Sequence, residues 1–504
     1  MGQQVLGSDK ILRLNDFNLL GLVQSEDWAP NFNAQDIFEM GNVSKLATAR
    51  ELETSGTLEV QSMGGTPGLL ARMVVVRTAS GAFSGYLYNA LGAFGKNGYT
   101  ITQDSLKEAT FDLLIHEKTD QITFDRSVAL TRCYPTTLSG RADANGTASE
   151  TIAWAGEFVV GLPNPYHDVR SIPATIGQGA DAGKLVLADS TVVSATHKLI
   201  YAYIDERRLR TVTTDAAYGT LDASGGKITI TGLTPQTDFK NAICRALVCK
   251  TTPSTTFPTI PASVSGTATS GAASTLTDST QSWTVNGFTG YNVTITSGTG
   301  AGQVRTIASN TATVLTVSAN WGTNPDSTSK YTIYFRDTTA FFIKGYQADI
   351  FLAPANINSP TVAEQWLKVQ SVDWSVDMRV EALRQIAFNT LGTTIYCRVP
   401  TYPFAITANI SVNETDWKDW KAVLSKTFPG TDVYQDSYDL APDNIKDPFG
   451  LVIVYKTKSG AELCRWKFTD MSVDGYGNRA NIGGRGEITW ALRGTSFTLV
   501  GLNA

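Results

Sequence analysis

Few residues in this chain could do acid–base, nucleophilic or metal chemistry, and they are spread along it. The histidines are His116, His167 and His197, and the cysteines are Cys133, Cys244, Cys249, Cys397 and Cys464. No two histidines have the spacing of a metal-binding pair, and Cys244 and Cys249 lack a second pair of ligands. We therefore predict no metal site, and free, mostly buried thiols in a reducing compartment.

A glycine-rich run, residues 298–302 (GTGAG), has the composition of a phosphate-binding loop. A P-loop needs Lys and then Ser or Thr after its last glycine, because the ammonium group must reach the phosphates. Here Gln303 and Val304 follow, and strand-like runs lie on both sides. The pattern therefore predicts a hairpin turn.

Paired carboxylates also occur, at Glu26/Asp27 and at Asp436/Asp439. Nothing in the sequence places a nucleophile or a base beside them, and the G-x-S-x-G nucleophile motif is absent. We predict that the chain is not an enzyme, that it needs no cofactor, and that it has no catalytic, cofactor-binding or metal-binding residues.

Composition indicates a multidomain β protein. The chain has 504 residues, of which 64 are Thr and 44 Gly, and only 17% are charged. Thr is β-branched and Gly supplies turn conformations, so this excess favours short strands and turns. The net charge of −5 argues against a generic DNA-binding protein. No apolar stretch has the length of a membrane span, and no secretory signal is visible.

The two ends of the chain resemble each other. Residues 23–28 read VQSEDW and residues 369–374 read VQSVDW. Strand-like runs and helix-start patterns follow both motifs, at Thr66 and at Thr415, each an N-cap residue type. We therefore predict a tandem duplication.

Each copy closes with a similar segment. Both segments begin with Glu, soon reach a tryptophan, Trp154 or Trp490, and end in Gly-Leu. From the VQS motif to this Gly-Leu, the two copies are nearly equal in length. We predict that the two tryptophans occupy equivalent buried positions.

The fold class expected is mainly β. Alternating apolar residues recur in runs such as 110–116, 49–60 and 398–412, and each copy should form a β-sandwich or barrel with one short helix. Residues 165–186 read as a linker, and strand-like runs follow to about residue 250. Between 251 and 329 the charge is very low and Ser, Thr and Gly dominate, which predicts an inserted all-β domain of five or six short strands.

These segments resemble the tail tube proteins of tailed bacteriophages. The resemblance rests on VQSVDWSVD, on NETDWKDWKAVL, and on CRWKFTDMSVDGYGNRANIGGRGEITWAL near the end. The first half carries the same elements, as in phages whose tube rings are trimers with pseudo-sixfold symmetry. Residues 262–335 resemble a small β-module that recurs in phage structural proteins.

The resemblance and the composition together divide the chain into four regions. They are a first tube-like domain (1–164), a linker and β-rich middle segment (165–254), an inserted small all-β module (255–335) and a second tube-like domain (336–504). Within the middle segment, residues 187–250 depart from the plan of the tail tube family.

The resemblance implies a virion protein, made in the host cytoplasm, that polymerises as stacked trimeric rings into a hollow tube. Sheath, tape measure and baseplate proteins would be further partners. DNA would pass through the lumen without specific binding, and no membrane would be involved.

Three other functions remain open from the sequence. The chain could be a distal tail or baseplate ring protein, or a receptor-binding, adhesin-like tail protein. The third, which the missing catalytic residues disfavour, is an enzyme such as a glycan-cleaving tail protein. The charge of the first copy is compatible with a channel for DNA, because residues 1–162 include 12 basic and 18 acidic residues. An acidic wall would repel DNA phosphates rather than retain them.

Overall fold

A computed structural model defines the architecture of the chain. It describes residues 10–14, 17–18, 23–38, 45–61, 99–106, 110–118, 124–156, 158–162, 169–206, 210–215, 219–230, 243–252, 263–283, 288, 292–334, 343–352, 356–366, 369–384, 395–413, 448–456, 460, 462–479 and 487–501. The fold is mainly β, as the composition predicts, and one of its sheets is nearly closed in the manner of a barrel. None of the helices in these ranges is long and apolar enough to cross a membrane.

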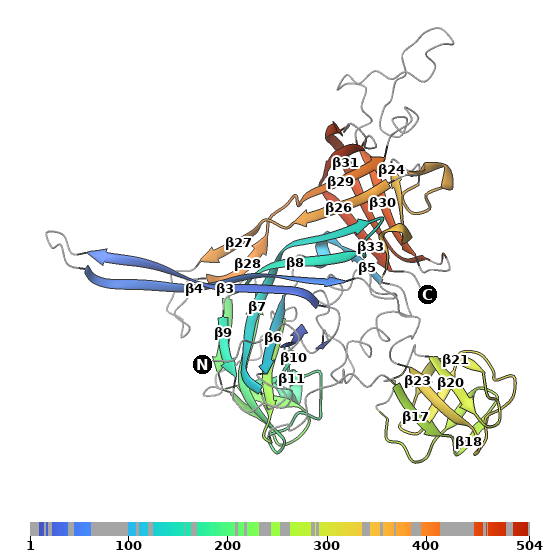
Figure 1. The fold of residues 1–504 in the computed structure, drawn as a ribbon. Coiled ribbons are helices and arrows are strands. Elements are labelled where there is room, and N and C mark those ends of the chain that lie inside the picture. Colours follow the sequence, from blue (N-terminus) through green and yellow to red (C-terminus); the bar gives the residue numbers. More distant parts are fainter. Residues whose placement is uncertain are drawn as a thin grey trace, which may run out of the picture.

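The largest sheet contains strands from both ends of the chain (Figure 1). From the first half come β1 (Lys10–Leu14), β2 (Phe17–Asn18), β3 (Val23–Phe38), β4 (Lys45–Gln61), β5 (Tyr99–Thr102), β6 (Phe111–Lys118), β7 (Phe124–Asp143), β8 (Ser149–Gly156) and β9 (Phe158–Leu162). From the second half come β24 (Ala348–Leu352), β25 (Gln365–Trp366), β26 (Val369–Asp377), β29 (Ala405–Asn413), β30 (Phe449–Lys456), β31 (Glu462–Arg479), β32 (Glu487–Gly494) and β33 (Ser496–Gly501).

One face of this sheet forms the main core. Residues alternate between buried and partly exposed along β8 and β33, because successive side chains of a strand point to opposite faces. Tryptophans fill much of the space: Trp374 lies 4.1 Å from Trp466, and Trp366 lies 5.4 Å from Trp490, measured between ring centroids. A single apolar core thus joins the two halves of the chain.

The two halves repeat one strand arrangement. In the first, β3 pairs with β4, β4 with β8, β8 with β7, and β7 with β6 and β9. In the second, β26 pairs with β29, β29 with β32, β32 with β31, and β31 with β30 and β33. The edge pairs β1–β6 and β24–β30 also correspond.

The irregularities of the two halves fall at equivalent positions. The β3–β4 ladder shifts register between Val23 and Ser25, and the β26–β29 ladder shifts between Val369 and Ser371. Such bulges are built features of a fold, since each one re-aims a strand. The same number of positions along the chain separates each residue of β6 and β7 from its counterpart in β30 and β31. Arg132 and Asp470, a pair at that spacing, have positive φ angles of 54° and 55°.

Register corrects one prediction from the sequence. Trp154 and Trp490 are both buried on the core face, at 1% and 0% exposure. However, Trp154 pairs with Gly56, whereas Trp490 pairs with Ile410, the counterpart of Leu58. The two tryptophans are therefore out of register with each other, and they are not equivalent. The shared Glu and Gly-Leu landmarks suggested the wrong alignment of the closing strands.

A second sheet lies between the halves in sequence. It comprises β10 (Arg170–Ile176), β11 (Lys184–Leu187), β12 (His197–Glu206), β13 (Arg210–Asp215), β14 (Gly219–Leu221), β15 (Lys227–Ile230) and β16 (Ile243–Lys250). Because β10 and β11 belong to it, the prediction of a linker over 165–186 is wrong for its described part. A short 3-10 turn, Gly179–Asp181, joins these two strands. The described Pro, Gly, Ala and Asp residues of the segment 165–186 belong to these two strands and to the turn between them.

A third sheet forms the inserted module. It comprises β17 (Ser263–Thr267), β18 (Ser270–Ala272), β19 (Thr275–Thr277), β20 (Asn292–Ser297), β21 (Val304–Asn310), β22 (Val314–Val317) and β23 (Lys330–Tyr334). The run 298–302 is the predicted hairpin turn between β20 and β21, and Gly298, Gly300 and Gly302 all have positive φ. Figure 1 shows this module apart from the other sheets.

The remaining elements are short. A hairpin of β27 (Val380–Arg384) and β28 (Ile395–Pro400) continues β26 and β29 outward. The run 398–412, expected as one alternating stretch, is divided between β28 and β29, with a cis peptide bond before Pro403. Helical turns are α3 (Gln103–Leu106), Gly345–Gln347 and Val362–Glu364. The helices expected to begin at Thr66 and Thr415 lie outside the described residues.

Candidate functional site

The histidine and cysteine side chains that the structure describes are buried, and His167 and the Cys397 side chain lie outside the described ones. His116 Nδ1 lies 2.8 Å from Ser127 Oγ, but both side chains are buried, so no substrate could reach the pair. Cys133, Cys244, Cys249 and Cys464 are buried, as predicted for most of the cysteines. Within these ranges no three His, Cys, Asp or Glu side chains are grouped as metal ligands would be.

The feature with the clearest capacity for interaction is the junction between the two halves. Strand β7 of the first half pairs antiparallel with β26 of the second, from Thr137 opposite Asp377 to Asp143 opposite Ser371. We call this stretch of paired residues the internal seam. Two further backbone hydrogen bonds extend it, from Ala144 to Gln370 and from Met378 to Thr136.

One tryptophan anchors the core side of the internal seam. Trp374 is 2% exposed and packs on Trp466 and Phe468. Gly140 stands opposite it on β7, and a Cβ atom added there would lie 2.5 Å from Cζ2 of Trp374. The ring therefore lies directly against the backbone of β7, and only glycine leaves it room.

The opposite face of the internal seam is polar. Arg141 Nε lies 3.4 Å from Asp373 Oδ1, directly across the two strands. An open hollow of about 350 Å³ lies beside this pair. Its lining includes hydroxyl, amide and charged side chains, namely Glu59, Ser139, Arg141, Ser149, Thr151, Asp373, Ser375, Thr407 and Asn409. Partial burial raises the pKa of Asp373, Arg141 opposes that rise, and Asp143 adds to it.

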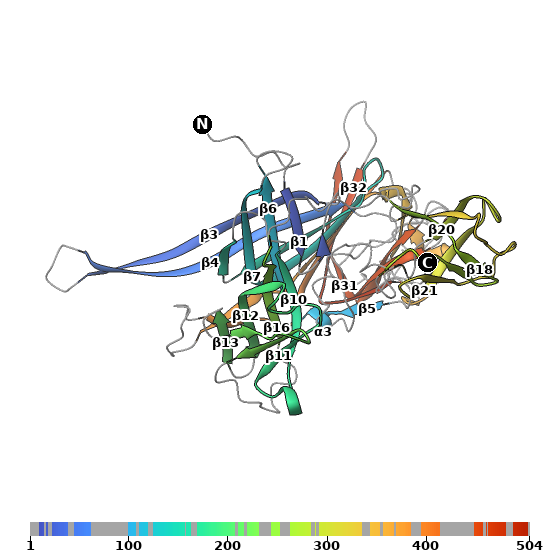
Figure 2. The same ribbon diagram turned by 90° about the horizontal axis from the view of Figure 1, so that it is seen from below.

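The first half reaches the second half at two more places. Strand β5 pairs with β33, so Tyr99–Thr102 becomes an edge of the second half's sheet. Arg398 on β28 forms an ion pair with Glu53 on β4, with 2.9 Å between Nη2 and Oε1. Figure 1 shows that the β3–β4 hairpin extends beyond the body of the sheet, and Figure 2 shows the same extension from below.

Repetition leaves matching edges at the two ends of this arrangement. By position, β3 is the counterpart of β26, and β31 is the counterpart of β7. Among the described residues β3 pairs only with β4, and the stretch of β31 from Ser472 to Arg479 pairs only with β32. An unpaired strand edge exposes backbone donors and acceptors, which makes it a template for another chain.

The outer faces of the two halves are covered differently. On the first half the middle sheet packs against Leu114 and Ala129. Arg13 Nη1 donates to the Val169 carbonyl at 2.7 Å, and Ser171 Oγ lies 2.5 Å from Asp112 Oδ2. These contacts fix the middle sheet on one side of the first half.

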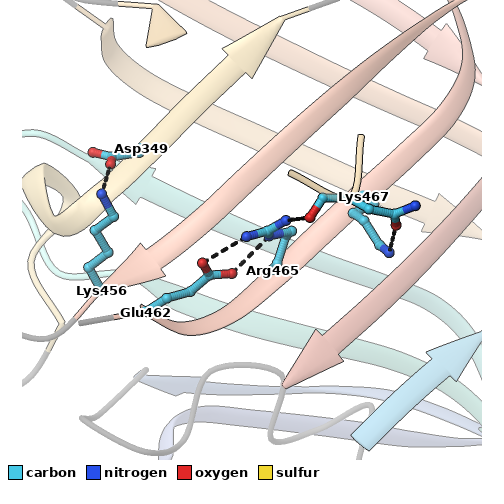
Figure 3. Close-up of polar contacts among 6 residues, drawn as sticks. Asp349, Lys456, Glu462, Arg465 and Lys467 are labelled. Atoms are coloured by element: carbon cyan, nitrogen blue, oxygen red, sulfur yellow. Dashed lines mark hydrogen bonds and ion pairs between the residues drawn. The ribbon is translucent and has the colours of Figure 1, made fainter. Parts of the chain in front are cut away.

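On the second half the equivalent face has ion pairs (Figure 3) beside a small apolar cluster of Phe351, Val452 and Val454. Lys456 pairs with Asp349, and Arg465 forms two 2.8 Å contacts with Glu462. Lys467 donates to the Asn358 side chain at 2.7 Å, and burial together with nearby Arg465 lowers the pKa of Lys467. The two halves thus present one repeated sheet but different outer surfaces.

The internal seam was not predicted from the sequence. The VQS motifs marked β3 and β26, but nothing in them states which strand each one faces. The sequence does hold matching residues, since Arg141 and Arg479 lie at equivalent positions, as do Asp27 and Asp373. Their equivalence can be recognised only once the strands are aligned by their register in the structure.

Comparisons with known proteins do not assign the chain to a family. No family model matches it, and no curated protein matches it. A solved structure of a FadL homologue from Pseudomonas aeruginosa is 11% identical, over 98% of this chain and 89% of its own length, with a TM-score of 0.08. A likeness this weak has no bearing on the function.

Proposed function

We propose that this chain is the structural subunit of a bacteriophage tail tube. Three chains would form a ring with six copies of the repeated sheet, and rings would stack into a hollow tube that conducts DNA into the host. The internal seam is the observation that carries this proposal. A seam that joins copy one to copy two, with matching edges left at both ends, is what a closed ring requires.

The number of chains follows from the repeat together with the tail tube resemblance. Tail tube rings of this type have six copies of the fold, so two copies per chain give three chains. Internal seams would then alternate with seams between chains around the ring. Closing the sheet in this way removes the edges at β3 and β31, which would otherwise promote uncontrolled aggregation.

The polar face of the repeated sheet suits the wall of a DNA channel. The apolar side chains of the repeated sheet pack into the core on one face, so in this proposal the opposite, polar face lines the lumen. Described acidic side chains outnumber basic ones on the polar face. The acidic ones are Asp27, Glu59, Asp143, Asp373, Asp377 and Asp474, and the basic ones are Arg141 and Arg493. Such a wall repels phosphates, which favours passage over retention.

In this proposal the chain performs no reaction. Its partners are other copies of itself, and sheath, tape measure and baseplate proteins are the further partners expected of a tail tube. The protein would be made in the host cytoplasm and reside in the virion. We place such partners on the outer face of the second half, at the ion pairs around Arg465.

Electron microscopy of the purified protein tests the proposal. We expect long hollow tubes built from stacked trimeric rings. Single rings that never stack would instead fit a distal tail or baseplate protein. Compact trimers with glycan-binding activity would fit an adhesin, and either result would overturn the tube.

A binding assay with duplex DNA tests the conduit. At physiological salt we expect assembled tubes to bind no more tightly than a non-specific contact, with Kd about 10⁻⁴ M or weaker. Tight binding with a steep salt dependence would mean that basic side chains line the lumen, which would contradict an acidic wall.

A further inference from the structure

We propose that β3 of one chain pairs antiparallel with β31 of a second copy of this chain, in the register of the internal seam, so that Asp27 faces Arg479. This inference rests on the proposed ring, and it names the partner strand and the residue register of the contact between chains. Its basis is the repeat, together with the two strand edges that, among the described residues, pair with no further strand.

Position fixes which residues correspond between β3 and β26. The bulge after Val23 matches the bulge after Val369, so counterparts are found by counting the same distance from each bulge. Asp27 is therefore the counterpart of Asp373, and Ala29 is the counterpart of Ser375.

A second pair of bulges aligns β7 with β31. The β7–β8 ladder shifts register after Pro135, and the β31–β32 ladder shifts after Val473. The positive φ angles described above stand at the same distance before each bulge, which supports the alignment. Gly477 is therefore the counterpart of Ser139, and Arg479 is the counterpart of Arg141.

The internal seam then dictates the register between chains. In it, Asp373 stands opposite Arg141, and Ser375 stands opposite Ser139. Transferring these pairs to their counterparts puts Asp27 opposite Arg479 and Ala29 opposite Gly477.

Charge supports this register independently of the backbone. The Arg141–Asp373 ion pair lies across the internal seam, and the sequence has the same two residue types at both counterpart positions. Opposite charges directly across two strands stabilise their pairing, and a slip by one residue would move each side chain to the other face. The inferred contact therefore repeats the polar pair as well as the strands.

Exposure supports the same edge. Ala29 and Gly477 are exposed, and Trp28 is only partly buried although its counterpart Trp374 is 2% exposed. A second chain along β3 would cover the part of Trp28 that is exposed in a single chain.

Two positions depart from the geometry of the template. Pro30 is the counterpart of Val376 and has no backbone N–H to donate, so the contact between chains has one hydrogen bond fewer at this position than the internal seam.

The second position is Asn478, the counterpart of Gly140, where only glycine leaves room for the ring of Trp374. At the contact between chains, Trp28 must therefore pack beside Asn478 rather than across the backbone. Trp28 already packs against the core of its own chain, which is compatible with this difference.

Disulfide cross-linking tests the register. Ala29→Cys and Gly477→Cys are made in separate full-length chains, mixed and mildly oxidised. A Cβ at residue 477 would meet no atom within 4 Å, so the substitution should not disturb the fold. Directly opposite Cβ atoms lie about 4.5–5.5 Å apart, close to disulfide distance. We expect a covalent dimer from the mixture and none from either variant alone.

Gly475→Cys provides the matched control. It lies on the same strand face, and its added Cβ also meets no atom within 4 Å. A diagonal neighbour lies about 7–8 Å away, beyond disulfide reach, so its mixture with Ala29→Cys should give no dimer. Dimers from this control mixture, or none from the first mixture, would overturn the register.

A charge exchange tests the ion pair. Asp27→Arg alone should weaken association between chains roughly tenfold per contact, because it places like charges opposite each other. The double variant Asp27→Arg/Arg479→Asp should restore association. Asp104→Arg, in α3, makes the same charge change away from both edges and should have little effect. If the double variant associates no better than the single one, the pair does not form.

The two proposals can fail separately. Cross-linking reads the contact between chains whether or not tubes form. Cross-linked dimers without tubes would support the register and contradict the tube. Tubes without the cross-link would support the tube and overturn the register.

Discussion

Replacing Gly140 with alanine perturbs the internal seam at its tightest point. The added Cβ would lie 2.5 Å from Cζ2 and 2.6 Å from Cε2 of Trp374, which is closer than real Cβ contacts allow. The ring cannot easily retreat, because Trp466 lies 4.1 Å away on its other side and Trp374 is 2% exposed. Overpacking of this kind costs about 1–3 kcal/mol, partly offset by about 0.4–1 kcal/mol from the less flexible unfolded chain. We expect a net loss of stability of roughly 1–2 kcal/mol.

Urea unfolding followed by tryptophan fluorescence measures this loss. The matched control is Gly161→Ala on β9, where an added Cβ meets no atom within 4 Å. That variant should be neutral or more stable by up to about 1 kcal/mol. If Gly140→Ala unfolds at the wild-type urea concentration, or if both variants lose the same stability, the reasoning about the seam is refuted.

Three further predictions concern single elements. Trp154→Ala and Trp490→Ala should each cost about 3–5 kcal/mol and reduce soluble protein, measured by unfolding and yield. In the module, the Tyr331 hydroxyl donates a hydrogen bond to Asp278 Oδ2 at 2.7 Å. Burial raises the pKa of Asp278, but its hydrogen bonds outweigh burial, so this pKa is lowered from its ordinary value. This stabilisation should be present above about pH 4 and lost in thermal scans as the pH falls through the lowered pKa, but not in Asp278→Asn. Deleting residues 263–334 and joining the flanks with a Gly/Ser linker should leave assembly intact under the microscope; a folded variant that never assembles would place the module in the ring contact.

Much of the fold could be predicted from local pattern. Alternation over 49–60 and 398–412 identified β4 and β29, and strand spacing identified the module, because a half-buried strand needs an apolar residue at every second position. The VQS motifs marked equivalent strands, as the matching bulges at Val23 and Val369 show.

Other features could not be read from pattern. The run 450–456 was expected to alternate and does form a strand, β30, but that strand is buried on both faces, since Phe351, Val452 and Val454 form an outer cluster. The segment 165–186 looked like a linker, because turn-forming residues hid the short strands β10 and β11. Trp154 and Trp490 were misaligned because a shared motif gives order along the chain but not register across strands.

The internal seam was invisible for a related reason. Pairing between Arg141 and Asp373 joins residues far apart in sequence, and no local rule specifies which strand edges meet. Only the ladder registers show that Arg479 and Asp27 stand at the same two positions.

Cryo-electron microscopy of the assembled protein tests the central claim most directly. We expect a hollow tube of stacked rings, with three chains per ring, six copies of the repeated sheet around the lumen, and β3 of each chain paired with β31 of the next. A monomer, an open dimer, or a ring in which these two strands lie apart would contradict it.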